Sequence, residues 1–367
     1  MRNKFDLGEW AGAFGDLGTL IPFVVGYIAV LGINPTGILV SFGIFMIIAG
    51  LRFKTPFPVQ PMKAIGATAI ASAGTITPNM VWGAGLFSGL FWLIISASGA
   101  LKWVAKIASK PLVRGISLGL GISFMMQGTG FMSEGVVIAC IAVVIAFVLI
   151  NSKRIPAMLV LLVLGIITSL ITNPLPSIRV SFTLPTFALS ELVWQDILTG
   201  IFILAIPQIP LTLGNAVIAS TAENNRLFPE HPTTENRVAA FKGIMNLAAP
   251  VIGGIPMCHG AGGIAAHTRF GGKTGGTMII IGGILLVLGL FFASSVLSIF
   301  GMIPPPVLGT ILFFAGLELA MSARDIGTDK QDFYILLITA GFSLWNVGIG
   351  FLAGLLVQQL TKWRKII

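Results

Sequence analysis

The sequence predicts an all-α polytopic membrane protein with fourteen transmembrane segments, arranged as a seven-plus-seven inverted repeat. Three observations predict this class: the composition, the order of apolar runs and helix breakers, and the placement of basic residues. Of the 367 residues, 55% are hydrophobic and only 10% are charged, and the mean hydropathy is +0.96. Because a soluble domain carries roughly 25% charged residues, this composition excludes a soluble globular protein. The first ten residues are polar, so we expect no cleaved signal peptide.

Apolar runs bounded by glycine, proline and charge mark the segments. Their expected spans are residues 13–31, 35–51, 61–73, 80–99, 112–127, 135–150, 156–172, 193–219, 238–252, 259–268, 276–297, 304–321, 333–345 and 347–361. An odd number of spans inverts a second copy. We therefore expect a first repeat at 1–172, a linker at 173–192 that contains Pro174, Pro176 and Pro185, and a second repeat at 193–367.

The net charge of +9 indicates orientation rather than nucleic-acid binding, because basic loops stay in the cytoplasm. With the N-terminus inside, 20 of the 22 Lys and Arg residues fall in cytoplasmic loops, Lys242 among them. Arg179 falls outside, and Lys63 lies within the membrane. We therefore expect both termini in the cytoplasm, a multi-pass protein of the plasma membrane, and lipid rather than nucleic acid as its surroundings.

The third segment is interrupted. Pro56, Pro58 and Pro61 fall within six residues, which no transmembrane helix interior favours. Residues 62–73 are compatible with a helix of half a span. We expect a short extended strand and then a half-helix that begins near the bilayer midplane, with Pro61 as its opening residue.

The tenth segment repeats this pattern. An extended run at 255–257 precedes a short helix that starts at about Gly260. Paired interrupted segments in two halves are the best sequence pointer to a transporter's binding site. Both helix N-termini offer unpaired N–H groups and a positive dipole, which suit an anion. The expected backbone contacts are Gly260, Ala261 and Gly262.

Two charged residues and a hydroxyl fall at membrane depth. Lys63, at the start of the third-segment helix, either joins the anion site, or extends to water, or pairs with Asp16. Asp16, in a glycine-broken part of the first segment, either couples a proton or cation to transport, or orients Lys63, or caps the broken helix. Thr19 either donates its hydroxyl to the substrate or bonds back to its own helix.

Three amides accompany these charges. Gln60 directly precedes the strand-to-helix transition, and Gln208 and Asn215 lie in segment eight, the inverted mate of segment one. We expect Pro207 and Pro210 to break that segment. Neutral amides satisfy oxyanion oxygens and also join helices, so both interpretations of these residues stay open.

His259 either donates to substrate, or titrates in coupling, or is a packing residue. His267 reads as structural. Cys140 and Cys258 are not expected to form a disulfide. With only Cys258, His259 and His267 nearby, no metal site and no cofactor are expected.

Four stretches resemble the molybdate transporter family, a branch related to the sulfate permease superfamily. They are Gly-Asp-Leu-Gly-Thr at 15–19, Phe-Pro-Val-Gln-Pro-Met-Lys-Ala-Ile at 57–65, Ile-Pro-Gln-Ile-Pro-Leu-Thr-Leu-Gly-Asn at 206–215, and Met-Cys-His-Gly-Ala-Gly-Gly-Ile-Ala at 257–265. The resemblance covers essentially the whole chain. Lys273 stands where the family leads us to expect Arg, and no STAS domain is expected.

The resemblance implies a core domain of segments 1–4 and 8–11, and a gate domain of segments 5–7 and 12–14. It implies molybdate as substrate, sulfate as a related oxyanion, and a homodimer formed through the gate. The family motifs fall on residues 58–63, which include Met62, and on residues 258–263.

The function predicted is secondary active transport of a tetrahedral oxyanion, molybdate first and sulfate second, by alternating access. A nucleobase–proton symporter would want a carboxylate near the tenth-segment helix, which offers none. An anion channel is the alternative from another class. An intramembrane enzyme using Cys258 and His259 is disfavoured, because neighbours in an extended run point to opposite sides.

Overall fold

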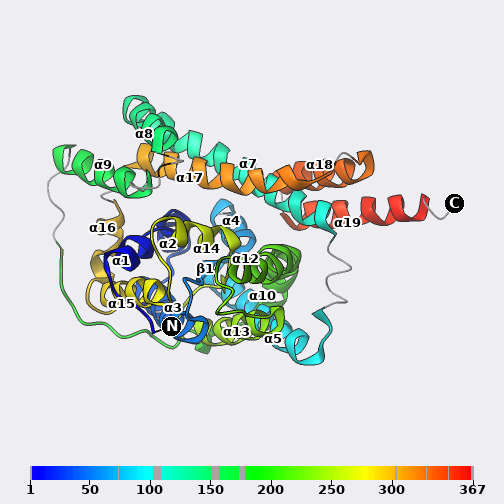
Figure 1. Ribbon diagram of the computed structural model, residues 1–367, viewed down its shortest axis with the longest axis horizontal. Coiled ribbons are helices and arrows are strands. Elements are labelled where there is room, and N and C mark those ends of the chain that lie inside the picture. Colours follow the sequence, from blue (N-terminus) through cyan, green and yellow to red (C-terminus); the bar gives the residue numbers. More distant parts are fainter. Residues whose placement is uncertain are drawn as a thin grey trace.

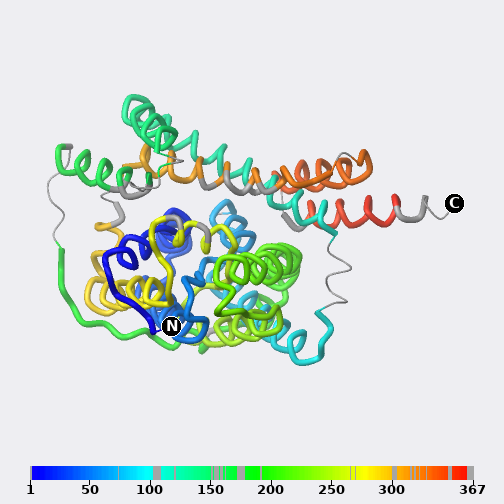
Figure 2. The backbone as a smooth tube through the Cα atoms, in the orientation of Figure 1, coloured from blue at the N-terminus to red at the C-terminus, as the bar shows by residue number. Residues whose placement is uncertain are grey.

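The computed structural model describes residues 2–72, 74–101, 109–149, 152, 157–172, 178–301, 304–327, 329–345 and 347–364. This part of the chain is mostly helical and contains one two-stranded sheet (Figures 1 and 2). The predicted linker prolines Pro174 and Pro176, and the predicted span ends at 73, 150 and 156, lie outside the described residues.

The helices gather into two bodies. The first body, in the lower half of Figure 1, contains the sheet together with helices that precede and helices that follow the central linker in the sequence. Its elements are α1 (Leu7–Ala13), α2 (Leu17–Leu31), α3 (Pro35–Phe53), β1 (Gln60–Pro61), α4 (Lys63–Ala71), α5 (Pro78–Ser98), α10 (Trp194–Gly200), η3 (Ile201–Ala205), α11 (Ile206–Leu211), η4 (Thr212–Ala219), α12 (Ser220–Leu227), α13 (Glu235–Ala248), η5 (Ala249–Ile252), β2 (Met257–Cys258), α14 (Ala261–Arg269), α15 (Gly276–Phe291), η6 (Ala293–Ser295) and α16 (Val296–Gly301).

The second body lies along the upper side in Figure 1. Its elements are α7 (Lys110–Met132), η1 (Ser133–Gly135), α8 (Val136–Leu149), α9 (Ala157–Thr172), α17 (Pro305–Met321), η7 (Ser322–Asp325), α18 (Lys330–Trp345) and α19 (Val347–Arg364). Helices α7 and α17 pack along one another, and α18 and α19 extend this layer. A short turn, η2 (Leu189–Glu191), leads from the linker back into the first body.

Four described helical runs are long and apolar enough to cross a membrane on their own: residues 35–53, 78–98, 110–149 and 194–227. Two bent pairs raise this number to six: α1 with α2, bent by 42°, and α15 with α16, bent by 91°. The chain is therefore a multi-pass membrane protein.

Local chemistry explains where the spanning helices begin and end. Helix α3 starts at Pro35, and the side chain of Asn34 accepts a hydrogen bond from the N–H of Thr36, the second residue of the helix. Helix α5 repeats the arrangement with Thr77 and Pro78. Proline loses nothing at a first helical position, because its missing N–H would be unpaired there. Gly99 ends α5 in the left-handed conformation that glycine adopts without steric cost.

Helices α7 and α17 approach one another through glycines. A Cβ atom on Gly121 would lie 2.5 Å from the carbonyl oxygen of Gly316, and the reciprocal distance is also 2.5 Å. Gly128 and Gly309 form the same kind of pair one heptad along. Glycines spaced by seven on two antiparallel helices let the backbones pack closely, as membrane helices commonly do.

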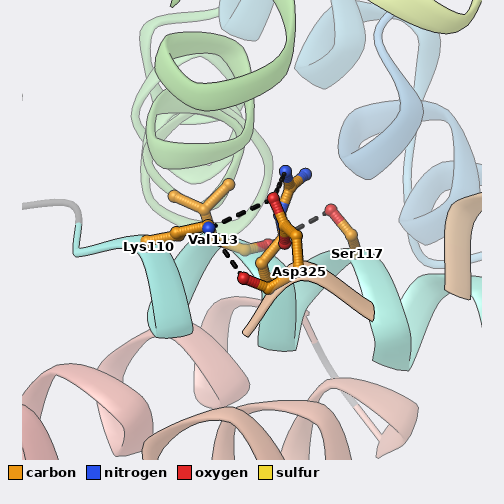
Figure 3. A network of polar contacts seen from close by, with 5 residues as sticks. Lys110, Val113, Ser117 and Asp325 are labelled. Atoms are coloured by element: carbon orange, nitrogen blue, oxygen red, sulfur yellow. Dashed lines mark hydrogen bonds and ion pairs between the residues drawn. The ribbon is translucent and has the colours of Figure 1, made fainter. Parts of the chain in front are cut away.

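An exposed ion-pair network joins the start of α7 to η7 in the second body (Figure 3). The guanidinium of Arg114 donates to both carboxylate oxygens of Asp325, at 2.9 and 2.7 Å. The ammonium of Lys110 lies 3.2 Å from the same carboxylate and donates to the Asp325 carbonyl oxygen at 2.7 Å. Partial burial acts to raise the pKa of Asp325, but the hydrogen bonds and charges of Arg114 and Lys110 outweigh it and lower that pKa.

Segment eight corrects the prediction that Pro207 and Pro210 break it. Residues 194–227 form one continuous helical run, in which α11 carries both prolines between the π-helical turns η3 and η4. In a π-turn each N–H bonds five residues back, as the N–H of Ile206 does to Ile201. This wider turn accommodates the prolines without interrupting the helix.

Segment eleven corrects a second expectation. Helix α15 ends at Phe291 instead of continuing to residue 297, and the chain turns by 91° into α16. The linker takes over the terminal carbonyls of α15: the N–H groups of Ser181 and Thr183 donate to Phe291 and Leu290, at 2.9 and 2.8 Å. The helix end is therefore satisfied by the connector rather than by further helix.

Candidate functional site

The site is organised by the small sheet at the centre of the first body. Strand β1 pairs antiparallel with β2, with Gln60 opposite Cys258 and Pro61 opposite Met257. Each strand leads directly into a short helix, α4 and α14 respectively. Pro61 therefore belongs to the strand rather than opening the helix, which corrects our expectation. Pro61 is paired across the sheet and Met62 is still extended, so helix α4 begins at Lys63.

The N-terminus of α14 is open. The N–H groups of Gly263 and Ile264 bond back to Gly260, but those of Ala261 and Gly262 have no acceptor among the described residues. Gly262 is exposed, and a Cβ atom built on it would meet no atom within 4 Å. Two unpaired N–H groups at the positive end of a helix, with free space beside them, are suited to an anion.

Gln60 and Asp16 lie against this open helix end. The buried amide of Gln60 donates its Nε2 to a carboxylate oxygen of Asp16. Cβ atoms on Gly260 and Gly263 would collide with the Gln60 side chain, and one on Gly263 would lie 2.8 Å from Asp16 Oδ2. The Oε1 atom of Gln60 is buried and has no hydrogen-bond partner among the described residues.

Asn215 reaches the same helix end from η4, since its Nδ2 atom would lie 3.5 Å from a Cβ on Gly260. Thr19 lies half-buried on the first turn of α2, where its N–H donates to the Asp16 carbonyl oxygen at 3.0 Å. Gln60, Asp16, Asn215 and the start of α14 are thus brought together from four distant parts of the chain.

The N-terminus of α4, in contrast, is already occupied. Gln208, which is 2% exposed, places its Oε1 atom on the N–H groups of Ala64 and Ile65, at 2.8 and 3.3 Å. These are the groups expected to face the anion. In this conformation the amide of Gln208 caps α4, so the two helix ends are not equivalent.

Lys63 and Met62 lie at the start of α4. Met62 is fully buried, and its N–H donates to the carbonyl oxygen of Pro256. The Lys63 side chain is half-buried, and among the described residues it forms no ion pair with Asp16, whose partner is Gln60. Lys63 opens α4 directly after strand β1 and Met62, so its side chain starts from the same strand-to-helix transition as Gln60.

His259 is fully buried, its Nδ1 atom is 2.7 Å from the Pro58 carbonyl oxygen, and its ring stacks on Phe241. Phe53 and Phe57 complete the surroundings. Its Nε2 atom is buried and has no hydrogen-bond partner among the described residues, so the roles in substrate binding and coupling stay predictions beside the packing role. His267 is likewise buried, with Nδ1 2.7 Å from the carbonyl oxygen of Gly12, as a structural histidine would be.

The structure corrects the expectation that Lys242 lies in a cytoplasmic loop. It is fully buried on α13, where its ammonium donates to Thr212 at 3.0 Å and lies 5.6 Å from the Trp92 ring. A single Lys inside the apolar run 238–252 was the available signal. The positive-inside rule outweighs this signal, because it favours assigning a Lys near a helix end to a cytoplasmic loop.

Glu9 was also missed. Its buried carboxylate accepts hydrogen bonds from the backbone of Lys273, Thr274 and Thr277, and from the Thr277 hydroxyl. It therefore caps the start of α15 and ties the N-terminal helix α1 to it. A carboxylate at a helix N-terminus is favourable, so we assign Glu9 a structural role. Only the tertiary fold brings these distant positions together.

The fold resembles solved structures of anion transporters. The transmembrane domain of a cyanobacterium bicarbonate transporter, BicA, aligns with a TM-score of 0.68 at 18% identity, covering 96% of this chain and 98% of that one. Murine Solute Carrier 26 family member A9, an anion transporter in the inward-facing state, aligns with a TM-score of 0.71 at 12% identity, covering 100% and 69%. The chain thus shares the fold of these solved transporters.

Sequence relatives give the family. A family model described as "Molybdate transporter of MFS superfamily" matches residues 8–124 and 200–319. Molybdate transporter 2 of Arabidopsis thaliana is 30% identical over 98% of this chain and 88% of its own length. Molybdate transporter 1 of the same plant is 32% identical over 98% and 89%. The chain belongs to the molybdate transporter family, whose members are transporters and not enzymes.

Proposed function

We propose that the protein is a secondary active transporter of a tetrahedral oxyanion, with molybdate as the preferred substrate and sulfate as the weaker one. One observation carries the proposal: the uncapped N-terminus of α14 opens into free space, with two backbone N–H groups that have no acceptor among the described residues. Membership of the molybdate transporter family supplies the substrate class. A compact oxyanion has four acceptor oxygens and suits backbone N–H donors.

We propose fourteen membrane segments in two inverted repeats, with segment three at α4 and segment ten at α14. The packing of α3 on α15 and of α13 on α5 supports this. Each of these pairs joins the second segment of one proposed repeat to the fourth segment of the other. The first body would be the core and the second body the gate (Figure 1). Both termini would face the cytoplasm of a plasma-membrane protein, and the gates of two copies would form a homodimer.

The anion would be held at the start of α14 by the N–H groups of Ala261 and Gly262, with Lys63 adding charge from α4. Asn215 would donate its amide from η4. The α4 N–H groups become available only when Gln208 leaves them. Gln208 therefore stands in for an anion oxygen on α4 in the empty site, and its displacement would accompany substrate binding.

Asp16 would couple proton and anion through Gln60. An ionised Asp16 accepts from Gln60 Nε2, which leaves the Oε1 acceptor turned toward the anion-binding end of α14. A protonated Asp16 would donate to Oε1 instead, and the rotated amide would then present Nε2 to the anion. Protonation of Asp16 would thereby replace the repelling Oε1 atom of Gln60 beside the anion with the Nε2 donor. Core movement against the gate would carry both across the membrane by alternating access.

The proposal is tested by uptake of labelled molybdate into proteoliposomes, with sulfate as competitor and Lys63→Ala as the site variant. We expect saturable uptake that sulfate inhibits weakly and that Lys63→Ala abolishes. Sulfate uptake with no preference for molybdate would reassign the substrate to sulfate. Folded protein that takes up neither anion would refute oxyanion transport, and a large unitary current would indicate a channel.

A further inference from the structure

Lys242 is a buried positive charge that the proposed binding site does not use. Its side chain is 0% exposed in the middle of α13. None of the ion pairs formed by the described residues includes it. Its ammonium donates to Thr212 and lies over the Trp92 ring, contacts that solvate a cation only in part. A buried charge without a counter-ion is costly, so its retention calls for a function.

A short chain of hydrogen bonds connects Lys242 to the site. Its ammonium donates to the Thr212 hydroxyl at 3.0 Å, and Gln208 Nε2 lies 3.1 Å from the same hydroxyl oxygen. Gln208 in turn accepts from the first free N–H groups of α4. Two side chains, Thr212 and Gln208, thus lie between the Lys242 ammonium and the N-terminus of α4.

Helix α13 also fixes the other side of the site. One turn after Lys242, Asn246 holds Met257 of β2 through two hydrogen bonds, at 2.6 and 2.8 Å. Residues four apart lie on the same helix face. This face of α13 therefore holds the ammonium in a fixed position relative to both strand-to-helix transitions.

We propose that Lys242 is the fixed counter-charge for the bound dianion, a residue that acts on the substrate through space from its place beside Thr212. The inference rests on the proposed function and extends it to charge selectivity. In a water-poor interior, a charge acts over several ångströms with little screening. A dianion then gains twice as much from Lys242 as a monoanion of the same shape. The empty site carries the uncompensated charge, and binding neutralises it.

The experiment measures equilibrium binding of molybdate and of perrhenate, a tetrahedral monoanion, to the purified full-length protein. Lys242→Met removes the charge and keeps the side-chain volume, and Lys242→Arg keeps the charge. Lys330→Gln is the control, since it removes an exposed cation from α18 in the second body. Thermal unfolding checks that each variant is folded. Lys242→Met should be at least as stable as the wild type, because an apolar residue replaces an unpaired buried charge.

For Lys242→Met we expect the molybdate Kd to rise about tenfold and the perrhenate Kd about threefold, because Coulomb energy scales with ligand charge. Lys242→Arg should retain the preference for the dianion, and Lys330→Gln should change neither Kd. Equal changes for the two anions, or none, would overturn the counter-charge while leaving molybdate binding by the wild type intact. Wild-type protein that binds neither anion would overturn the proposed function, and this inference with it.

Discussion

A substitution at Gly262 tests the proposed anion site without disturbing the fold. A methyl group on it would meet nothing in the empty site, so Gly262→Ala should fold with an unchanged Tm. With the anion bound, that methyl group would occupy the space of an oxygen. Because a hydrogen bond to a charged group contributes about 1.5–3 kcal/mol, we expect the molybdate Kd to rise about tenfold or more.

Gly283→Ala is the matched control for that substitution, since Gly283 on α15 also has open space around it. It should leave the Kd unchanged and keep or raise the Tm, because alanine favours helix. An unchanged Kd for Gly262→Ala, measured by titration calorimetry, would place the anion elsewhere.

Asp16 gives a second prediction at the residue scale. Asp16→Asn removes the carboxylate but can still accept a hydrogen bond from Gln60. We expect uptake driven by an inward proton gradient to fall to the level seen without a gradient, while molybdate exchange across the membrane continues. The comparison uses proteoliposomes with and without an imposed pH difference. Persistent stimulation by the gradient in Asp16→Asn would exclude coupling through this carboxylate.

The sequence pointed to several of these residues, and to others only in part. Asp16, Gln60 and Asn215 were singled out as polar groups at membrane depth, and they do lie together against α14. The cap that Gln208 places on α4 could not be foreseen, because it depends on the relative position of helices that are distant in sequence. Lys242 was misplaced because a rule for loop charges was applied to a residue inside a helix.

At the scale of elements, the glycine contacts between α7 and α17 set the stability of the second body. Gly121→Ala would place a methyl group against the Gly316 carbonyl, and overpacking of this kind costs about 1–3 kcal/mol. Gly130→Ala on the same helix meets open space and should be neutral or stabilise by up to about 1 kcal/mol, because alanine favours helix. Thermal unfolding in detergent distinguishes the two. Equal Tm values would show that the helices do not approach closely there.

The Asp325 ion pairs give a pH prediction for the same body. The pKa of Asp325 is lowered in the folded protein, so its stabilising effect is present above its ordinary value of 3.8 and is lost as the pH falls below it. Since the groups are partly exposed, Asp325→Asn should cost only about 0.2–1 kcal/mol near neutral pH. The difference in Tm between wild type and variant should shrink toward pH 3. A difference that grows on acidification would contradict the ion-pair account.

Helix positions could be predicted well where caps and apolar runs agree: α3 starts at Pro35 as predicted, and α5 starts at Pro78, two residues before the predicted start. They could not be predicted where tertiary contacts replace local signals. The prolines of segment eight looked like breakers, but π-turns absorb them. Helix α15 stops early because the linker bonds to its last carbonyls, a contact that no local pattern encodes.

At the scale of the whole molecule, the helices form two bodies, and the first body contains the pair of short strands from which α4 and α14 start (Figure 1). The described helices give four to six spans by length and composition, and the run 110–149 covers two of the predicted segments, so the count of fourteen stays a proposal. The hydropathy of the sequence predicted a multi-pass protein. The pairing of β1 with β2 across 195 or more residues shows why the site needs both halves.

The most direct measurement is to locate the metal atom of bound molybdate by anomalous diffraction at the molybdenum edge. The account predicts one peak at the start of α14, within reach of the Ala261 and Gly262 N–H groups and of Gln60, with Gln208 displaced from α4. A peak at another place in the fold, or a peak at α14 with Gln208 still capping α4, would contradict it.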